Sequence, residues 1–386
     1  MRYLTAGESH GPAQTAIIEG LPANLLVQNE AINRELARRQ LGYGRGGRME
    51  IEKDQVEVLA GLRFGRTLGS PLALRVLNKD HENWLEKMAP WGQLPHSLDT
   101  VTQPRPGHAD LSGALKYDVY DIRDILERAS ARETVTRVAV GAVAKELLKV
   151  FEIQVYSYVQ AIGPVTAQLP VAASVVANYQ AVETSPVRCP DPVVATQMML
   201  VIDDAKAQGD SLGGVFTVVA TGLPVGLGSH VQWDRKMDGR LAAALMSIQA
   251  IKGVEMGDGF AAAARPGSLV HDEIFYNSST GYYRKTNHAG GIEGGITNGE
   301  AVVCRVAMKP IPTLYKPLNS VNMADHTAFA ATVERSDTCA VPAAAIVGEA
   351  VVAWELALAL REKFAGDSLD EMKANYRSYM ERVAKR

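Results

Sequence analysis

The stretch SARETVTRVAVGAVAKELLKV, residues 130–150, is the clearest helix pattern in the sequence. Ser130 and Glu133 have the spacing of a capping box, in which two side chains satisfy the free backbone N–H groups at a helix start. Val135, Val138 and Leu148 follow at spacings that place them on one face. The stretch therefore predicts a long helix with an apolar stripe.

Helix and strand patterns alternate on both sides of this stretch. Further helices are expected at residues 29–40, 234–250, 342–366 and from 369 onward, where Ser368 and Glu371 repeat the capping-box spacing. Strands are expected at residues 15–18, 49–59, 71–77, 152–162, 198–203, 214–221 and 300–308. No strict sequence repeat is found. The pattern favours one large body of mixed helices and strands over separable domains, and a pseudo-duplicated architecture would have the same pattern.

The composition is that of a soluble globular protein. The 386 residues include 40 basic and 43 acidic side chains, for a formal net charge of −3, and 47% are hydrophobic. This composition excludes a disordered, fibrous or coiled-coil chain. A slightly acidic protein has no bulk attraction for nucleic acid or for an acidic membrane surface, so we expect neither partner. An anionic ligand would need local clusters of Lys and Arg.

The cysteines and the apolar segments indicate the compartment. The three cysteines, Cys189, Cys304 and Cys339, are far apart and form no CxxC pair, which disfavours a disulfide framework or a cysteine zinc site. The N-terminus has no basic-then-apolar signal pattern. The most apolar stretch, residues 340–360, is interrupted by proline and two glutamates, so no segment is expected to span a membrane. We expect a cytoplasmic protein.

A histidine lies in the glycine-flanked loop GESHGP, residues 7–12, before the strand expected at 15–18. In such a loop the backbone can approach a ligand closely, and His10 can exchange a proton near neutral pH. The alternative is a surface or turn-capping histidine, which is the commoner role for a single histidine.

Five arginines cluster at residues 34–48: Arg34, Arg38, Arg39, Arg45 and Arg48. Guanidinium groups bind carboxylate and phosphate oxygens in a bidentate manner, so the cluster indicates a small polyanionic ligand. Two alternatives remain open. Arg38 and Arg39 can stabilise the C-terminus of the helix that they close. The RGGR string resembles an RNA-binding box, although a single copy without interleaved aromatics is weak evidence.

Two further loops carry basic or titratable residues. RPGHAD, residues 105–110, places Arg105 beside His108, and with His10 this indicates an acid/base pair for a charged substrate rather than a zinc site, since no third ligand is spaced for a metal. ERASARET, residues 127–134, places Arg132 in the first turn of a helix, where the dipole disfavours a cation. A bound anion would compensate. The alternative is an ordinary capped helix with a solvated arginine.

The last motifs lie late in the chain. NHAGGIEGGITNG, residues 287–299, fits neither GxGxxG opening a helix nor the P-loop, which disfavours Rossmann and Walker nucleotide sites. KPIPT, residues 309–313, adds Lys309 on a rigid turn. Arg335 and Asp337 precede the helix expected from 342, where Asp337 could serve merely as an N-cap. Titratable loops without a nucleophile triad or metal signature indicate a catalytic site for a multiply anionic ligand.

Taken together, these motifs resemble the chorismate synthase family. GESHG (7–11), ERASARET (127–134) and RSD (335–337) resemble its three signatures. LGYGRGGRM (41–49), RPGHAD, the glycine-rich loop and KPIPT occur in the same order as in that family, so the resemblance covers essentially the whole chain. One departure is Ala129, where the family more often has serine, which could remove one hydroxyl contact to the flavin.

The resemblance implies a fold, a reaction and an assembly. The fold would be α+β, a β-α-β sandwich with internal pseudo-symmetry, as one domain over residues 1–386. The reaction would be the anti-1,4-elimination of phosphate from 5-enolpyruvylshikimate 3-phosphate to give chorismate, the last common step of aromatic amino-acid synthesis. The family uses reduced FMN without net redox change, and the cofactor carries the difficult step. NADPH is a candidate reductant of the flavin. The assembly would be a homotetramer.

The resemblance also implies roles for individual residues. His10 would donate a proton to the departing phosphate, His108 would face the flavin, and Asp337 would assist proton removal. The flavin would be bound by Arg128, Ala129, Ser130, Ala131, Arg132, Gln249, Ala250, Gly294, Lys309, Pro310, Ile311, Pro312, Thr313 and Arg335. The substrate would be bound by Arg39, Arg45, Arg48 and Arg105, of which Arg39 and Arg45 are also candidates for NADPH contact. No metal is implied.

Two other functions compete with this interpretation. A flavin-dependent oxidoreductase with net electron transfer would need its own dinucleotide site, and the sequence has no such fingerprint. A non-enzymatic scaffold that binds anions or nucleic acid through the arginine loops would show steep salt dependence and no affinity for FMN. The net charge of −3 argues against the scaffold.

Overall fold

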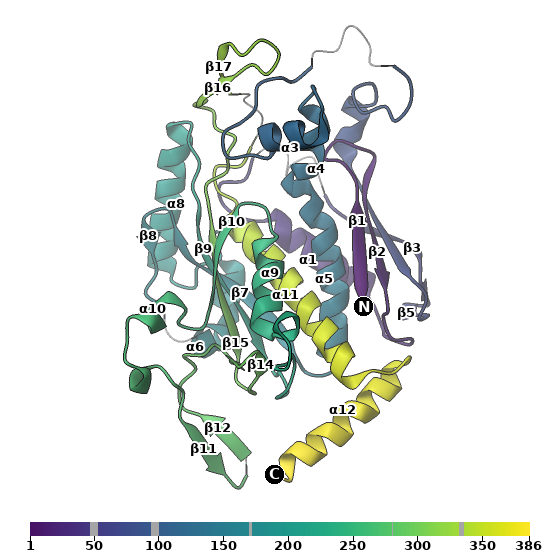
Figure 1. The fold of residues 1–386 in the computed structure, drawn as a ribbon, viewed down its shortest axis with the longest axis vertical. Helices are drawn as coiled ribbons and strands as arrows, with labels where there is room; N and C mark the ends of the chain where they lie inside the picture. The colour runs from purple at the N-terminus through teal and green to yellow at the C-terminus, as the bar shows by residue number, and fades with distance from the viewer. Residues whose placement is uncertain (47–52, 94–99, 170–171, 280, 332–335) are drawn as a thin grey trace.

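Helices form the middle layer of the fold. The computed structural model describes residues 1–46, 53–93, 100–169, 172–279, 281–331 and 336–386. At its centre α5 (Thr134–Lys149) packs against α11 (Val341–Phe364), with α1 (Asn29–Gln40) and α9 (Met237–Met246) beside them (Figure 1). A Cβ on Gly141 would lie 2.4 Å from the Cα of Ala350, so α5 and α11 can approach this closely only with glycine there.

One helix of the described chain, α11, is long and apolar enough to cross a membrane by length and composition. In the fold, 89% of its most apolar window is buried inside the protein. A helix that is apolar on every side is typical of a core element covered on all faces. The proline and the two glutamates expected to interrupt this stretch all lie within α11.

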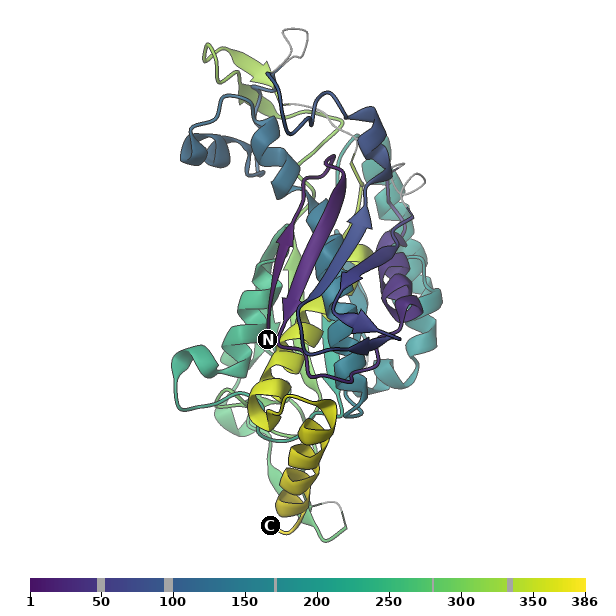
Figure 2. The same ribbon diagram turned by 90° about the vertical axis from the view of Figure 1, so that its right-hand side faces the viewer.

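A four-stranded antiparallel sheet covers one side of the helical layer. Its order is β1-β2-β6-β3, with β1 (Arg2–Ala6), β2 (Ala13–Glu19), β6 (Leu72–Leu77) and β3 (Val56–Ala60). Figure 2 shows this sheet in front of the helices. Leu72, Leu74 and Val76 alternate toward α5 and are at most 2% exposed, as expected for a sheet with one covered face.

A five-stranded sheet covers the other side. Its order is β10-β15-β9-β7-β8, with β10 (Ile251–Met256), β15 (Val302–Met308), β9 (Gly214–Thr221), β7 (Gln154–Ile162) and β8 (Val165–Thr166). It packs on α11, where a Cβ on Gly348 would lie 2.6 Å from the ring of Phe216. One continuous apolar cluster joins both sheets through the helices. The predicted α+β sandwich is therefore confirmed.

The two halves of the sandwich repeat one topology. The main elements run β1-β2-α1-β3-β6-α5 and then β7-β9-α9-β10-β15-α11, and the corresponding sheet orders are β1-β2-β6-β3 and β7-β9-β15-β10. A buried threonine also recurs. The hydroxyl of Thr67 donates to the carbonyl of Pro22 and accepts from the N–H of Leu25, while Thr297 makes the same pair of bonds with Pro224 and Leu227. Internal pseudo-symmetry is thus visible in both topology and hydrogen bonding.

Smaller elements surround the sandwich. They are β4 (Leu62–Arg63), β5 (Arg66–Thr67), η1 (Lys79–Asn83), α3 (Asp110–Tyr117), α4 (Arg123–Ala129), η2 (Ala131–Glu133), α6 (Ala172–Ala177), α7 (Tyr179–Thr184), α8 (Pro192–Ala207), η3 (Trp233–Arg235), α10 (Phe260–Ala263), η4 (Gly267–Leu269), β11 (Ile274–Asn277), β12 (Gly281–Arg284), β13 (Ile292–Glu293), β14 (Ile296–Thr297), β16 (Asn319–Val321), β17 (Ala328–Ala330) and α12 (Leu369–Ala384). In Figure 1, α3 and α4 lie at the top, and the β11–β12 hairpin and α12 at the bottom.

Most predicted elements are confirmed within a few residues, including the complete capping box of Ser368 and Glu371 at the start of α12. The strand predicted at 198–203 is wrong, because these residues lie inside α8. Asp191 caps that helix by accepting from the N–H groups of Val193 and Val194, and Met198 and Ile202 are buried four residues apart. Of the strand predicted at 49–59, residues 49–52 lie outside the described residues, and the rest pairs only from Val56.

The capping box predicted for Ser130 and Glu133 is half right. The Ser130 hydroxyl accepts from the N–H of Arg132, but this opens the short turn η2, and α5 begins only at Thr134. Glu133 does not reach back to Ser130. Its carboxylate accepts instead from Arg137, Thr5 and Gln249, because the sheet and the end of α9 supply donors that the sequence pattern does not show.

Candidate active site

The predicted site residues gather at one end of the sandwich. The N-termini of α5 and α11 both point toward this end, where α3 and α4 also lie (Figure 1). Hydrogen bonds join the loops 105–110, 309–313 and 336–340 here, and the loop 7–12 is bonded to Asn78 and Glu127. Helix N-termini favour anions through their free N–H groups and dipoles, so the repeated halves of the fold bring two such ends together.

His10 is buried and held on several sides. Its Nδ1 lies 2.8 Å from Oε1 of Glu127, and its backbone N–H donates to Oε2 of the same carboxylate at 2.7 Å. The ring stacks on Trp84 at a centroid distance of 3.9 Å and an interplanar angle of 22°. Its Nε2 lies 4.0 Å from a carboxylate oxygen of Asp80. The surface or turn-capping histidine is therefore wrong for His10.

Asp54 joins two buried arginines beside the start of α5. It accepts from Arg39 Nη2 at 2.8 Å and from Arg132 Nη1 at 2.6 Å. Burial acts to raise the pKa of Asp54, but the two guanidinium charges outweigh it and hold that pKa below its usual value. Burial lowers the pKa of Arg39 to about 10, against the attraction of Asp54. The group thus carries two positive charges and one negative charge out of contact with water.

This arrangement explains the cation in the first turn of the α5 segment. The anion that offsets Arg132 is the carboxylate of Asp54, so the solvated arginine of the ordinary capped helix is wrong. Arg132 Nε also donates to the Asn78 side chain at 2.8 Å, and the amide of Asn78 donates to the carbonyl of Gly11 at 2.7 Å. The arginine group and the His10 loop are therefore one hydrogen-bonded unit.

Arg45 and Asp337 meet at the start of α11. One carboxylate oxygen of Asp337 accepts from the N–H of Gly46 at 2.7 Å, and the other lies 3.4 Å from Nε of Arg45. Asp337 is therefore more than an N-cap, since it holds the loop that follows α1. The positive charge of Arg45 also contributes to the lowered pKa of Arg39, which places the two arginines in electrostatic contact.

His108 and Arg105 share Asp110. The carboxylate of Asp110 accepts from Arg105 Nε at 2.8 Å and lies 2.5 Å from His108 Nδ1. Burial acts to raise the pKa of Asp110, but the hydrogen bonds from His108 and Arg105 outweigh it and lower that pKa well below its usual value. Arg105 Nη1 also donates to the hydroxyl of Thr313 at 2.9 Å.

The KPIPT loop connects these residues with the ends of α9 and α11. Lys309 Nζ donates to the carbonyl of Gly107, and the Ser336 hydroxyl donates to the carbonyl of Thr313 at 2.9 Å. The N–H of Lys309 donates to the carbonyl of Ala250 at 2.9 Å. Burial, with help from nearby Lys252, lowers the pKa of Lys309. Five predicted flavin residues, 309–313, thus lie against the His108 loop.

Gln249 and Ala250 form the turn between α9 and β10. Gln249 donates through its amide to Glu133 at 3.2 Å, while its buried Oε1 accepts no hydrogen bond from the described residues. Ala250 has a left-handed backbone with φ of 66°. Such a conformation is costly for alanine and is found where the surroundings require it, often at functional sites.

The remaining residues of the ERASARET motif line the same region. Arg128 closes α4 and donates to the carbonyl of Gly7 at 3.1 Å and to the hydroxyl of Thr5 at 2.7 Å. Ala129 is the last residue of α4, and Ala131 begins η2 after Ser130. The motif is therefore fixed against the loop that carries His10.

Some predicted residues lie elsewhere or cannot be placed. Arg48 and Arg335 lie outside the described residues. Gly294 lies in the β13–β14 turn, where Gly295 accepts from Met237 at the start of α9, so the length of α9, about 15 Å, separates it from Gln249. Within this subunit Gly294 does not join the other predicted flavin residues.

One arginine of the cluster at residues 34–48, Arg38, is not available to a ligand in the predicted way. Arg38 is buried in a group with Glu35, Glu183 and Glu349, whose carboxylates accept from its guanidinium at 2.7–2.8 Å. The expectation that Arg38 binds a polyanionic ligand is therefore wrong, because carboxylates of the protein already match its charge. Arg34 is exposed and lies 3.9 Å from Glu35.

Four carboxylates and one aromatic ring that hold these groups are not predicted from the sequence: Asp54, Asp80, Trp84, Asp110 and Glu127. Only Asp110 and Glu127 lie inside quoted motifs. The others come from segments with no motif, so tertiary contact alone identifies them. Among the described residues, no group of histidine, cysteine and carboxylate side chains could hold a metal ion.

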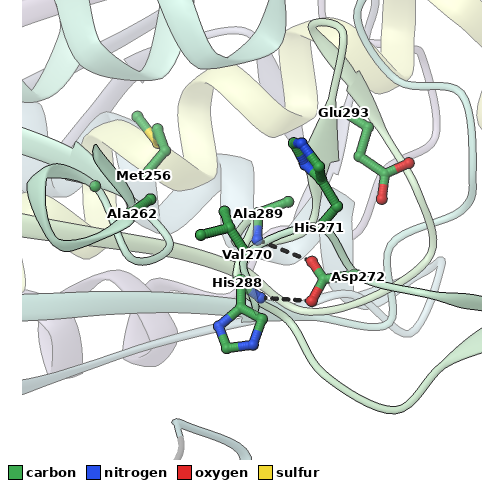
Figure 3. Close-up of a pocket in the computed structure, with 9 residues that line it drawn as sticks. Met256, Ala262, Val270, His271, Asp272, His288, Ala289 and Glu293 are labelled. Carbon is green, nitrogen blue, oxygen red and sulfur yellow. Dashed lines mark hydrogen bonds between the residues drawn. The ribbon is translucent and has the colours of Figure 1, made fainter. Parts of the chain in front are cut away.

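A separate hollow of about 490 Å³ lies near α10 (Figure 3). Asp272 accepts there from the N–H groups of His288 and Ala289, both at 2.9 Å, and His271 and Glu293 also line it. Glu293 precedes Gly294 in the chain. Among the described residues, none of those predicted for the site lines this hollow, so it is distinct from the site at the helix N-termini.

Comparisons with known proteins agree on one family. The family model described as chorismate synthase matches residues 1–360. A chorismate synthase of Symbiobacterium thermophilum is 60% identical over 391 residues, with 100% of each chain covered. One of Pelobacter propionicus is 61% identical over 390 residues, with 99% of each covered. A solved crystal structure of chorismate synthase matches with a TM-score of 0.81 at 46% identity, covering 100% of this chain and 98% of that one.

Proposed function

Because the chain belongs to the chorismate synthase family, we propose that it converts 5-enolpyruvylshikimate 3-phosphate to chorismate and phosphate by an anti-1,4-elimination that requires reduced FMN. The observation that carries this proposal is the convergence of two imidazoles, four described arginines and Asp337 at the N-termini of α5 and α11. The activity makes the chain an enzyme of aromatic amino-acid synthesis.

The charges of the site match those of the substrate. The substrate has two carboxylates and a phosphate, and each can accept bidentate hydrogen bonds from guanidinium groups. Arg39 and Arg132 share one carboxylate, so they retain a net positive charge in a buried position. We assign substrate binding to Arg39, Arg45, Arg48 and Arg105, which hold the ring in one orientation and exclude water from the reacting bonds.

His10 is assigned the proton that the departing phosphate needs. Its Nδ1 is engaged by Glu127, so the proton that it can exchange is on Nε2. Protonating a phosphate oxygen lowers the charge that the leaving group must carry, which is general acid catalysis. The stack on Trp84 keeps the ring in one plane and shields one of its faces from water.

His108 and Asp337 are assigned to the other reacting position of the substrate, where the C–H bond breaks. Asp110 fixes the Nδ1 side of His108, so that the second ring nitrogen can serve the flavin. Asp337 is held by Gly46 and Arg45 at the entrance of α11, and we assign it to assist proton removal. A carboxylate alone is too weak a base for this C–H bond, which is why a cofactor is needed.

The residues present fit a flavin. The buried Gln249 Oε1 is an acceptor without a donor among the described residues, which suits a ring N–H group. Lys309 and the arginines offer positive charge for a phosphate. The flavin set also includes Arg128, Ala129, Ser130, Ala131, Arg132, Ala250, Pro310, Ile311, Pro312, Thr313 and Arg335, whereas Gly294 does not join them within this subunit. When bound, reduced FMN supplies electron density as phosphate leaves and takes up the hydrogen, with no net redox change.

Four further properties of the protein are proposed together with this activity. The chain acts as one domain over residues 1–386, which the continuous apolar core supports. NADPH serves as a source of electrons for the flavin, with Arg39 and Arg45 as its contacts. The assembly is a homotetramer. The enzyme is cytoplasmic, with a small-molecule substrate and neither nucleic-acid nor membrane partners, in keeping with its formal charge of −3.

The test is an anaerobic reaction with substrate and FMN reduced in advance. We expect chorismate and phosphate in equal amounts over many turnovers, with no consumption of reductant. Replacing His10 or His108 by Ala should each lower turnover by roughly 10- to 10⁴-fold. Arg48→Ala should mainly weaken substrate binding. Consumption of one reductant per product would instead indicate an oxidoreductase with net electron transfer. Wild-type turnover in either histidine variant would refute the assignment of that histidine.

A further inference from the structure

One carboxylate, that of Glu127, holds both the ring and the backbone of His10. Oε1 lies 2.8 Å from Nδ1 and Oε2 accepts from the backbone N–H at 2.7 Å. The carbonyl of Glu127 also accepts from the N–H of Ser9 at 3.0 Å. The Glu127 side chain is only 2% exposed, so it cannot move away without leaving these donors buried and unpaired.

The charge state of Glu127 settles which nitrogen of His10 carries a proton. Burial acts to raise the pKa of Glu127, but the hydrogen bonds and charge of His10, with that of Arg123, outweigh it and hold this pKa below its usual value. An ionised carboxylate can only accept hydrogen bonds. Nδ1 must therefore be the N–H nitrogen, and Nε2 is the position that gains and loses a proton.

The other groups around His10 leave Nε2 as its exchange position. Nδ1 of His81 lies 2.8 Å from the backbone carbonyl of His10, away from the ring nitrogens. Arg123 lies over Trp84 at 5.0 Å and reaches Glu127 at 3.5 Å, so it braces the stack and the carboxylate. A carboxylate oxygen of Asp80 lies 4.0 Å from Nε2.

We infer that Glu127 is the positioning residue of the proton donor: it fixes His10 in the Nδ1–H form, so that Nε2 delivers its proton to the departing phosphate. This inference rests on the function proposed for His10. In the step, the Nε2–H bond breaks, the proton passes to a phosphate oxygen, and the imidazolium becomes a neutral ring with Nδ1–H facing Glu127. The carboxylate then stabilises both forms of the ring without taking up a proton.

The variant Glu127→Gln should move the proton of neutral His10 from Nδ1 to Nε2. The backbone N–H of His10 can only donate, so it takes the single amide oxygen of Gln. The NH₂ group then faces Nδ1, which must become an acceptor, and the ring proton of neutral His10 moves to Nε2. A doubly protonated ring would place an N–H against the NH₂ group. In serine-protease triads the comparable Asp-to-Asn change lowers kcat by roughly 10⁴ through the wrong tautomer.

The experiment compares Glu127→Gln, Glu127→Asp, His10→Ala and the double variant Glu127→Gln/His10→Ala, each loaded with reduced FMN. Glu355→Gln is the control, because Glu355 is a partly buried carboxylate paired with Arg240, on α11 and outside the site. We expect kcat of the Gln variant to fall by about 10²- to 10⁴-fold, with KM and FMN affinity changed by no more than about threefold. The kcat of Glu127→Asp should be at least about tenfold higher than that of Glu127→Gln.

Two readouts separate positioning from a structural role. If Glu127 acts through His10, the double variant should be no slower than His10→Ala, because the two residues work as one unit. The ¹⁵N spectra of histidine-labelled protein, with His10 assigned from its Ala variant, should show Nδ1–H for neutral His10 in the wild type and Nε2–H in Glu127→Gln. The control should keep the wild-type kcat and spectrum.

The outcomes distinguish the inference from the function beneath it. If His10→Ala turns over like wild type, the role proposed for His10 fails. If His10→Ala is slow but Glu127→Gln is not, or if the two losses multiply in the double variant, the inference about Glu127 fails while the proposed function stands. An unchanged His10 tautomer in Glu127→Gln also overturns it. If the Gln variant folds poorly, Glu127→Asp is used instead. It keeps the carboxylate, so neutral His10 should still carry its proton on Nδ1, and an Nε2–H form in this variant would overturn the inference.

Discussion

Replacing Asp54 by Asn tests whether one carboxylate neutralises the buried arginine group. The Asp54 side chain is 0% exposed, while Arg39 and Arg132 are 6% and 3% exposed. Removing one partner of a buried ion pair leaves an uncompensated charge and costs about 3–5 kcal/mol. We expect Asp54→Asn to lower the free energy of unfolding at pH 7 by about this amount, measured by urea unfolding followed by circular dichroism.

The pH dependence of this difference has a definite sign. The folded-state pKa of Asp54 lies below its ordinary value of 3.8, because Arg39 and Arg132 outweigh the effect of burial. Its contribution to stability is therefore complete above about pH 4 and is lost as pH falls toward the folded-state pKa. The difference between wild type and the Asn variant, which does not titrate, should shrink as the pH falls through this range.

Phosphate offers a second measurement on the same pair of proteins. The arginine group goes from a net charge of +1 to +2 in the variant, so inorganic phosphate should raise the Tm of Asp54→Asn more than that of wild type. A ligand at 100 times its Kd stabilises by about 2.7 kcal/mol. The exposed Asp234→Asn is the control and should change stability by no more than about 0.5 kcal/mol. A loss below about 1 kcal/mol in Asp54→Asn would show that the buried arginines do not depend on this carboxylate for neutralisation.

Three other predictions concern the framework and are read by urea unfolding. Glu349→Gln should lower the free energy of unfolding at pH 7 by about 3–5 kcal/mol, because this 0%-exposed carboxylate binds Arg38 and Lys145. The folded-state pKa of Glu349 is far below 4.5, so the difference from wild type should become smaller as the pH falls. A difference that does not change with pH would contradict the ion pairing of Glu349. Gly141→Ala should cost at least about 1–3 kcal/mol because its Cβ would overlap Ala350 on α11, and an unchanged stability would show that the helices can separate. Ser368→Ala should cost about 0.5–2 kcal/mol through loss of the α12 cap, and Ser368→Gly only a few tenths.

The elements that the sequence predicted best are those in which local pattern and tertiary packing agree. The α12 capping box forms in full because both of its partners are adjacent and exposed. The box at Ser130 forms only in part, since the Glu133 carboxylate accepts instead from Arg137, four residues further along, and from Thr5 of β1. The strand prediction at 198–203 is wrong because short apolar runs occur in strands and in helices alike. The N-cap Asp191 followed by Pro192 at the start of α8 is the sequence signal that distinguishes the helix here.

The residues in the loops of the candidate site could be predicted from sequence motifs, but the residues that hold these loops in place could not. His10 and His108 lie in glycine- or proline-flanked loops that can be recognised in the chain. Asp54, by contrast, comes from a segment with no motif and meets Arg132, 78 residues away, only in the folded protein. The duplication leaves only short traces in the sequence: GLPxxL recurs at 20–25 and 222–227, and GxxxGxTxG recurs at 61–69 and 291–299. The matching hydrogen bonds of Thr67 and Thr297 give these traces their meaning.

The most direct test of the account is a structure of the enzyme with reduced FMN and substrate bound. We predict that both ligands lie at the N-termini of α5 and α11, with the substrate phosphate within hydrogen-bond distance of His10 Nε2 and the flavin against His108 and residues 309–313. Ligands bound instead in the hollow lined by His271 and Asp272, with His10 and His108 touching neither of them, would contradict the account (Figure 3).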